Sequence, residues 1–208
     1  MTTDALIFDL DGTLWDTTST CADTWNAVLA TLGITYRRMT VADIRAVTGQ
    51  PHEDGIRRAF PGLSDADVRR LAEATAREDN RAIATHGGLL YPGVRENVPQ
   101  LRARVPLMIV SNCQQGYVET FFTWSGLGAQ FVDFECWGNT GCDKAENLRR
   151  VIARHGLCAP WFVGDTDGDR TAARSNGVRF AHVTWGFGHV DDCDRRVGAF
   201  TELLGLLG

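Results

Sequence analysis

The chain has 208 residues, 44% of them hydrophobic, which suffices for one domain of ordinary size or for a core that carries a smaller insert. Its net charge of −5 and its lack of long basic runs argue against a nucleic-acid partner. No apolar stretch approaches the length of a membrane span and the first residues do not form a signal peptide, so we expect a cytoplasmic protein without a membrane partner. Its six cysteines form no C-x-x-C pair, which fits free thiols in a reducing compartment.

The first predicted strand is the apolar run at residues 5–8, and it leads into the sequence FDLDGT. Asp9 and Asp11 lie two positions apart, so their side chains share one face of the strand end, and Gly12 lets the backbone turn sharply behind them. Two carboxylates so close repel by ~4 kcal/mol at an effective dielectric of about 20, unless a cation or a shared proton offsets the repulsion. The pair suits phosphoryl transfer, with one carboxylate as nucleophile, the other as acid and base, and a divalent metal beside them. The alternative is a turn in which one aspartate caps a helix.

Between residues 15 and 90 the periodicity is helical and predicts no strand. Helices are expected over residues 21–32 and 41–47, and a third begins after Ser64 and continues to about residue 83. Glycine and proline then interrupt the pattern at residues 86–93. This stretch therefore predicts an all-helical insert.

From residue 105 onward short apolar runs alternate with amphipathic stretches. Strands are expected at 106–110, 131–136, 160–163 and 178–184, and helices at 116–124, 144–155, 170–175 and 199–207. The alternation predicts an α/β fold, a Rossmann-like parallel sheet with helices on both faces and an inserted all-helical cap domain. We expect residues 1–14 and 92–208 to form the core and residues 15–91 the cap.

Two further polar segments follow predicted strands, where ligands bind in open α/β sheets. Ser111 and Asn112 place a hydroxyl and free backbone N–H groups directly after a buried strand, which suits a phosphate oxygen, although such a pair is also a common turn. The residues from Asp165 to Asp169 contain three acids in five positions, a composition that suits Mg²⁺. A calcium loop is rejected because its closing glutamate is missing, and a plain aspartate-rich turn is the alternative.

Lys144 is the single lysine among 21 basic residues, and it lies near the start of a predicted helix. That end of a helix disfavours a cation unless an anion binds alongside it. A compact ammonium differs from the planar guanidinium that the chain uses everywhere else. The position therefore indicates an anion site, with a solvated lysine as the alternative.

The order of these motifs resembles that of the haloacid dehalogenase-like superfamily, and the resemblance covers essentially the whole chain, with the helical insert similar to the small helical cap of that family. The branch most like phosphoglycolate phosphatase is similar at Tyr-Pro-Gly-Val (91–94) and at Asn-Gly-Val (176–178). The resemblance implies a phosphatase that hydrolyses a small phosphate monoester, phosphoglycolate-like or a sugar phosphate, through an aspartyl-phosphate.

The resemblance also implies a role for each motif residue. Asp9 would be the nucleophile and Asp11 the acid and base; Ser111, the Asn112 backbone and Lys144 would bind the phosphate. Mg²⁺ would be held by a carboxylate oxygen of Asp9, the backbone carbonyl of Asp11 and the side chain of Asp165, while Asp169 would orient Lys144 or a metal-bound water.

Two other functions remain open at this point. A sugar-phosphate mutase of the same fold would typically use a lysine and a histidine in the insert, where His52 is present and lysine is not. A non-catalytic scaffold that binds phosphate or metal would keep the fold alone. For substrate selection, Arg45, Arg57 and Arg58 are candidates to pair with a substrate carboxylate.

Overall fold

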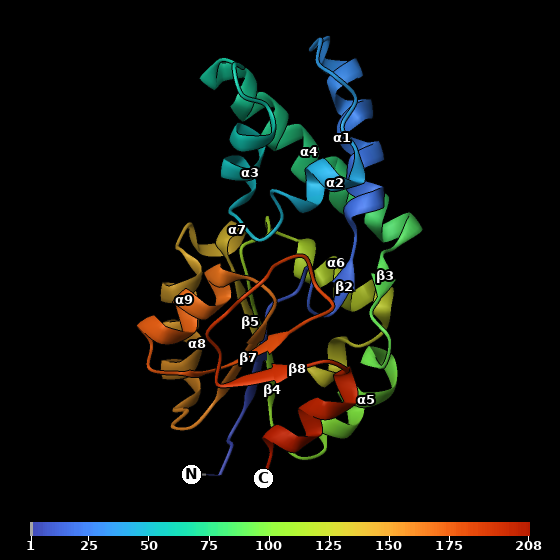
Figure 1. Ribbon diagram of the computed structural model, residues 1–208. Helices are drawn as coiled ribbons and strands as arrows, with labels where there is room; N and C mark the ends of the chain where they lie inside the picture. The colour runs from blue at the N-terminus through green and yellow to red at the C-terminus, as the bar shows by residue number, and fades with distance from the viewer. Residues whose placement is uncertain (1) are drawn as a thin grey trace.

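The computed structural model describes residues 2–208 and has a six-stranded sheet at its centre (Figure 1). Its strand order is β5-β4-β1-β6-β7-β8, and every neighbouring pair is parallel. The strands are β1 (Leu6–Phe8), β4 (Leu107–Ser111), β5 (Asp133–Cys136), β6 (Trp161–Gly164), β7 (Arg179–Val183) and β8 (Arg195–Val197). The predicted α/β class with a parallel sheet is confirmed, and β8 is an edge strand that the sequence did not predict.

Alternation along β1 assigns the two faces of the sheet. Leu6 and Phe8 belong to one hydrophobic cluster, while Ile7 belongs to the other. The helices α8 (Lys144–His155) and α9 (Asp167–Ser175) pack on the Ile7 side. The remaining core helices are α5 (Val94–Arg102), α6 (Tyr117–Ser125), α7 (Trp137–Thr140) and the 3-10 helices η1 (Gly128–Gln130) and η2 (Phe200–Leu206). Helices therefore cover both faces, as expected of a doubly wound fold.

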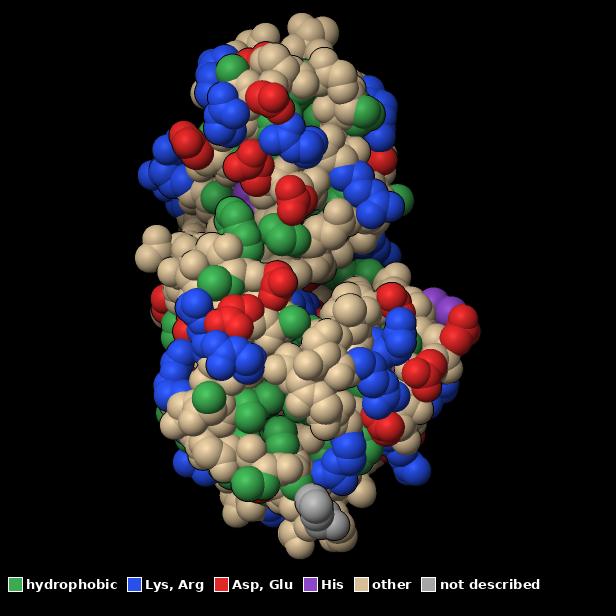
Figure 2. Space-filling view, turned by 90° about the vertical axis from the view of Figure 1, so that its left-hand side faces the viewer, with side chains coloured by type: hydrophobic (Ala, Val, Ile, Leu, Met, Phe, Trp, Pro, Cys, Tyr) green, Lys and Arg blue, Asp and Glu red, His purple; other side chains and the backbone are tan. Residues whose placement is uncertain are grey.

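The helical insert leaves the core after β1 and forms a separate lobe (Figures 1 and 2). It contains α1 (Thr18–Leu32), α2 (Val41–Arg45), α3 (His52–Ala59) and α4 (Asp65–His86). The sequence predicted three of these helices and missed α3. The expectation that residues 15–90 hold no strand is wrong, because β2 (Trp15–Asp16) pairs antiparallel with β3 (Leu89–Leu90). These two short strands lie side by side where the chain leaves the core and returns to it.

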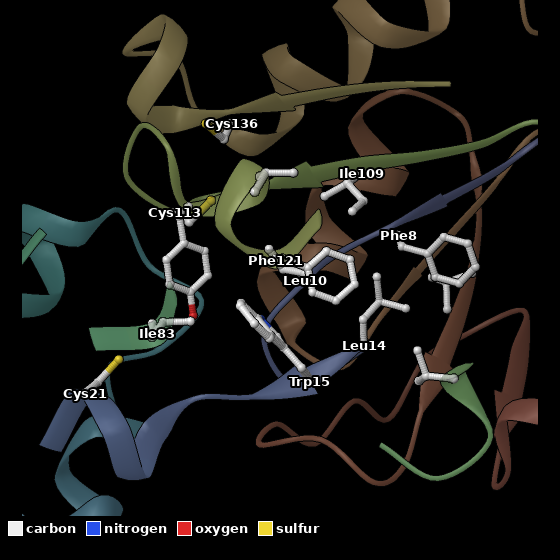
Figure 3. Close-up of a cluster of buried hydrophobic side chains, with 14 of the residues drawn as sticks. Phe8, Leu10, Leu14, Trp15, Cys21, Ile83, Ile109, Cys113, Phe121 and Cys136 are labelled. Carbon is white, nitrogen blue, oxygen red and sulfur yellow. The ribbon is translucent and has the colours of Figure 1, made fainter. Parts of the chain in front are cut away.

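One hydrophobic cluster runs from the sheet into the insert (Figure 3). Phe8 on β1, Leu14 and Trp15 are fully buried, and the same cluster continues to Cys21 on α1 and Ile83 on α4. Trp15 lies edge-on to the ring of Phe121, with ring centroids 4.9 Å apart. This packing holds the base of the insert beside the carboxyl ends of the strands. Within residues 2–208 the structure contains no helix with the length and apolarity that a bilayer crossing requires.

Candidate active site

Asp9 extends β1 by one residue, since its backbone N–H donates to the carbonyl of Val163 at 2.8 Å. The turn that follows depends on Gly12, which has φ of 82°. A Cβ atom at this position would lie 2.3 Å from a carboxylate oxygen of Asp165. The turn therefore requires glycine for its conformation and for the close approach of a second acid.

Asp11 is partly buried and is held by two hydroxyl groups. The phenol of Tyr117 donates to its Oδ1 at 2.7 Å, and the hydroxyl of Thr17 does so at 3.3 Å. Burial raises the pKa of Asp11 to about 7, although the Tyr117 hydrogen bond lowers it. A carboxyl group with that pKa can both release and take up a proton near neutral pH. Sequence reasoning missed Tyr117 and Thr17, because nothing in the sequence indicates that α6 and α1 converge on this loop.

Lys144 joins two of the predicted acids. Its ammonium lies 2.8 Å from Oδ1 of Asp9 and 2.6 Å from Oδ1 of Asp169, and all three side chains are buried. Burial lowers the pKa of Lys144, but the two carboxylates outweigh that effect and hold it above its usual range. Burial raises the pKa of Asp9 to about 6, against the opposing charge of Lys144. The chain's single lysine thus lies at the end of the sheet beside Asp9.

Asp165 follows β6 and is fully buried. Its Oδ2 accepts backbone N–H groups from Phe187 at 2.6 Å and from Gly188 at 3.2 Å. A Cβ atom at Gly186 would lie 2.4 Å from the same oxygen, so this loop must be glycine-rich to enclose the carboxylate. This loop thus fixes one oxygen of Asp165 by backbone hydrogen bonds, and a carboxylate oxygen of Asp165 lies within 4.8 Å of oxygens of Asp9 and Asp169.

Asp169 has both carboxylate oxygens occupied by this chain. Oδ1 accepts from Lys144, and Oδ2 accepts from the backbone N–H and the hydroxyl of Thr166, at 2.9 Å and 2.7 Å. The Thr166 contacts form a capping box at the start of α9. Of the two roles left open for Asp169, the geometry favours orienting Lys144.

The carboxylates fit a hard cation. Asp9, Asp165 and Asp169 each offer an oxygen, and these atoms lie within 4.8 Å of one another. Within residues 2–208, Oδ2 of Asp9 and Oδ1 of Asp165 are buried and have no hydrogen-bond partner. Burial raises the pKa of Asp165 to about 8, and the charges of Asp169 and Asp9 add to this. Buried carboxylates of this kind need either protons or a cation, and two free oxygens provide the ligand atoms that Mg²⁺ prefers.

Ser111 and Asn112 lie at the end of β4 and line the same cavity as Asp9 and Asp11. Ser111 is buried. The side-chain amide of Asn112 donates to the backbone carbonyl of Gly49 in the helical insert at 2.9 Å. The structure therefore brings these two residues next to the acids, and it gives the Asn112 side chain a contact between core and insert that the sequence did not predict.

The cavity lies between the carboxyl ends of the strands and the helical insert. Its walls from the insert are residues of α1, α2, α3 and α4 and the loop before α3. The lining side chains from this part are Thr17, Cys21, Trp25, Ile44, Val47, Thr48, Gln50, His52 and Asp79. Asp79 was missed, although it recurs with Ala72, Thr75 and Ile83 on the apolar stripe of its helix, a spacing that could have identified it.

The three arginines considered for a substrate carboxylate do not line this cavity. Arg45 forms an ion pair with Asp16 at 2.7 Å and lies over the ring of Phe187. Arg57 forms ion pairs with Glu53 and Asp65 on the exposed surface. The sequence-based expectation for these arginines is thus not supported by their positions.

Comparison with known proteins gives the family. The model of the haloacid dehalogenase-like hydrolases matches residues 6–183. The chain belongs to this family. It is 32% identical over 186 residues to a phosphoglycolate phosphatase of Synechococcus elongatus, covering 88% of this chain and 84% of the relative. A phosphoglycolate phosphatase of Aliivibrio fischeri is 28% identical, with 88% and 85% of the two chains covered.

Solved structures agree on the fold. A haloacid dehalogenase-like family hydrolase of Streptococcus pneumoniae superposes with a TM-score of 0.84 at 22% identity, covering 98% of this chain and 97% of that one. The resemblance inferred from the motifs is confirmed: the chain is a hydrolase of this family, in the branch similar to phosphoglycolate phosphatases.

Proposed function

We propose that the protein is a Mg²⁺-dependent phosphatase that hydrolyses a small phosphate monoester through an aspartyl-phosphate on Asp9. The observation that carries the proposal is the buried arrangement of Lys144 between Asp9 and Asp169, with Asp11 and Asp165 beside them. A nucleophile, a titratable carboxyl group and a compact cation at one strand edge are what phosphoryl transfer requires.

In the first half-reaction a carboxylate oxygen of Asp9 attacks the phosphorus, and the bond from phosphorus to the ester oxygen breaks. Asp11 gives its proton to the leaving alcohol. In the second half-reaction Asp11 takes a proton from a water molecule that attacks the phosphoryl group. The bond between phosphorus and Asp9 then breaks, which releases inorganic phosphate and restores both carboxyl groups.

The other residues position and neutralise charge. Ser111 and the backbone N–H of Asn112 would bind phosphate oxygens, and Lys144 would offset their charge. Asp169, held by Thr166, would keep the ammonium of Lys144 directed at the phosphate. Mg²⁺ would be held by Asp9, by the backbone carbonyl of Asp11 and by Asp165, and when bound it supplies a positive charge that offsets those of phosphate and carboxylates.

We propose further that residues 15–91 act as a cap over the reaction. The cavity is bounded by helices of this segment, and the Asn112–Gly49 hydrogen bond joins it to the core. A cap in this position excludes water from the phosphoryl group and contacts the leaving alcohol.

The test is phosphate release from p-nitrophenyl phosphate and from a panel of metabolite esters, with Mg²⁺ and with chelator. Metal-dependent release is expected. With a ³²P-labelled phosphate ester, the label should appear covalently on the wild-type protein and not on Asp9→Asn. Absence of turnover with every ester would instead support a scaffold. Interconversion of sugar-phosphate isomers without phosphate release would support a mutase, for which the described residues of the insert offer no lysine, and its histidines are the partly buried His52 and the exposed His86 at the end of α4.

A further inference from the structure

A buried acid of the insert faces the cavity and takes no part in the proposed chemistry. Asp79 on α4 is 2% exposed and lies in the cavity wall together with Trp25, Cys21 and Asp11. Its Oδ2 accepts the indole N–H of Trp25 at 2.9 Å. Its Oδ1 has no hydrogen-bond partner within the described part of the chain.

The neighbouring polar side chains do not satisfy this oxygen. Thr24 and Cys21 lie near Asp79 and lower the pKa of its carboxyl, but their own hydrogen bonds go elsewhere: the hydroxyl of Thr24 donates to the carbonyl of Thr20 at 2.9 Å, and the thiol of Cys21 donates to the hydroxyl of Thr17 at 3.8 Å. A buried polar atom without a partner is costly and is rarely kept unless something outside the chain pairs with it. The position of Asp79 in the cavity wall indicates that this partner is a ligand.

The same wall offers no positive charge to a second anionic group. Among the cavity-lining residues the only basic side chain is His52, whose pKa is lowered by burial to about 4, and its Nε2 bonds the hydroxyl of Thr75 at 2.9 Å. Arg45 is paired with Asp16 instead. A carboxylate on the leaving alcohol would therefore be buried beside Asp79 without a counter-charge, which is strongly unfavourable.

We propose that Oδ1 of Asp79 binds a hydroxyl group of the leaving alcohol, so that this enzyme prefers phosphate esters of small polyols to phosphate esters of hydroxy acids. The inference rests on the proposed phosphatase function and names its substrate class. A hydroxyl group fits this oxygen in either protonation state, because it donates to a carboxylate and accepts from a carboxylic acid. The indole of Trp25 fixes the other oxygen and so orients the free one.

Three esters that share a two-carbon chain test this directly. Ethyl phosphate, 2-hydroxyethyl phosphate and 2-phosphoglycolate differ only in a methyl, a hydroxymethyl or a carboxylate at the end of the alcohol. We expect kcat/KM for 2-hydroxyethyl phosphate to exceed that for ethyl phosphate by about threefold to tenfold, as one net hydrogen bond allows. The value for 2-phosphoglycolate should lie at least about tenfold below that for ethyl phosphate.

Substitution of Asp79 assigns the effect to this residue. In Asp79→Leu the ratio of hydroxyethyl to ethyl ester should fall to about one, and in Asp79→Asn, which keeps hydrogen-bonding atoms, most of the ratio should return. Glu73→Gln removes an acid from the exposed side of the same helix and should keep the wild-type ratio. A wild-type preference for 2-phosphoglycolate, or equal losses with all three esters in Asp79→Leu, would overturn the proposal.

Binding measurements separate this inference from the proposed function. If no ester is hydrolysed, the phosphatase function fails, and calorimetric titration of Asp9→Asn with the three intact esters still ranks them. Tighter binding of the hydroxyethyl ester than of 2-phosphoglycolate, lost in the double variant with Asp79→Leu, supports the role of Asp79. The reverse order refutes it.

Discussion

The sheet end and the helical insert each bury carboxyl groups, but they do so with different partners. At the sheet end Asp9, Asp165 and Asp169 crowd within 4.8 Å around the single ammonium of Lys144. In the insert Asp79 is alone, and its partner is the neutral indole of Trp25. Several acids with one cation leave a net negative charge that a metal can satisfy, whereas one isolated acid suits an uncharged hydrogen-bonding group. The number of charges therefore indicates a metal ion at the sheet end and an uncharged hydrogen-bonding group beside Asp79.

The two places also differ in how the backbone fixes them. The sheet-end acids follow paired strands, and two glycines hold Asp165 within contact of the first loop. Asp79 lies on a helix that joins the core through the two-residue strands β2 and β3 and through side-chain contacts such as Asn112 with Gly49. Paired strand ends suit the chemistry, while an insert joined to the core by two short strands suits recognition of the variable part of a substrate.

The largest effect on activity should come from substitution of the proposed nucleophile at the sheet end. Asp9→Asn should lower kcat with p-nitrophenyl phosphate by roughly 10⁴-fold or more, because an amide cannot form the covalent intermediate. Circular dichroism and thermal melting should show a folded protein. Retention of substantial activity in a folded variant would require another nucleophile and a different mechanism.

Substitutions of Lys144 and Arg149 compare a buried ion pair with a surface ion pair on the same helix. Lys144→Met leaves Asp9 and Asp169 buried without their cation, so we expect a loss of about 3–5 kcal/mol in unfolding free energy and a fall in kcat of about 100-fold. Arg149→Met breaks an exposed pair with Glu146 and should cost at most about 1 kcal/mol. Urea unfolding measures both, and similar costs for the two variants would contradict the importance given to the buried cluster.

How far the sequence predicts this molecule depends on the range of the interactions. The α8 helix was predicted at its observed bounds, since its cap at Asp143 and its apolar spacing are local signals. The acids were found because they follow strands, and parallel strands bring their carboxyl ends to one edge. Lys144 was found because it is the single lysine and lies at the start of a predicted helix. Tyr117 and the backbone amides of Phe187 and Gly188 were not predicted, because their contacts with Asp11 and Asp165 join segments far apart in sequence.

The insert was predicted less well for the same physical reason. Strands of two residues such as β2 carry no periodicity, and α3 begins at His52 after a proline, without a side-chain cap. Asp79 looks like any solvated acid in an arginine-rich helix until its place on the apolar stripe is counted. The arginines were candidates to pair with a substrate carboxylate, whereas Arg45 and Arg57 form ion pairs with acids of this chain.

The dependence of activity on Mg²⁺ distinguishes the role of Asp165 from that of Asp167. Chelation should abolish turnover, and added Mg²⁺ should restore it. Asp165→Asn should raise the Mg²⁺ concentration for half-maximal activity by about tenfold or more, because one charged ligand is lost. Asp167 is exposed and pairs with Arg170, so Asp167→Asn should leave that concentration unchanged. Equal shifts in both variants would show that the loop as a whole, and not Asp165, holds the metal.

A further test concerns the proton on Asp79. Burial raises the pKa of this carboxyl from 3.8 to about 8, and the Trp25 hydrogen bond opposes only part of the rise. The folded protein thus holds the proton more tightly than the unfolded chain does. The stability that Asp79 contributes is full below about pH 4 and is lost as the pH rises through about 8, at ~1.4 kcal/mol for each pKa unit at most.

An asparagine at this position cannot ionise, so between pH 5 and pH 8 the melting temperature of wild type should fall relative to that of Asp79→Asn. Thermal melts in identical buffers without Mg²⁺ measure the difference and cancel the titration of Asp11 and the sheet-end acids, which both proteins share. Glu73→Gln should follow wild type, because its carboxyl is exposed on the same helix. Parallel curves for wild type and Asp79→Asn would mean that Asp79 is already ionised in the folded protein. The insert would then hold a fixed negative charge beside the substrate, and an amino alcohol would replace a polyol as the better complement to the cavity.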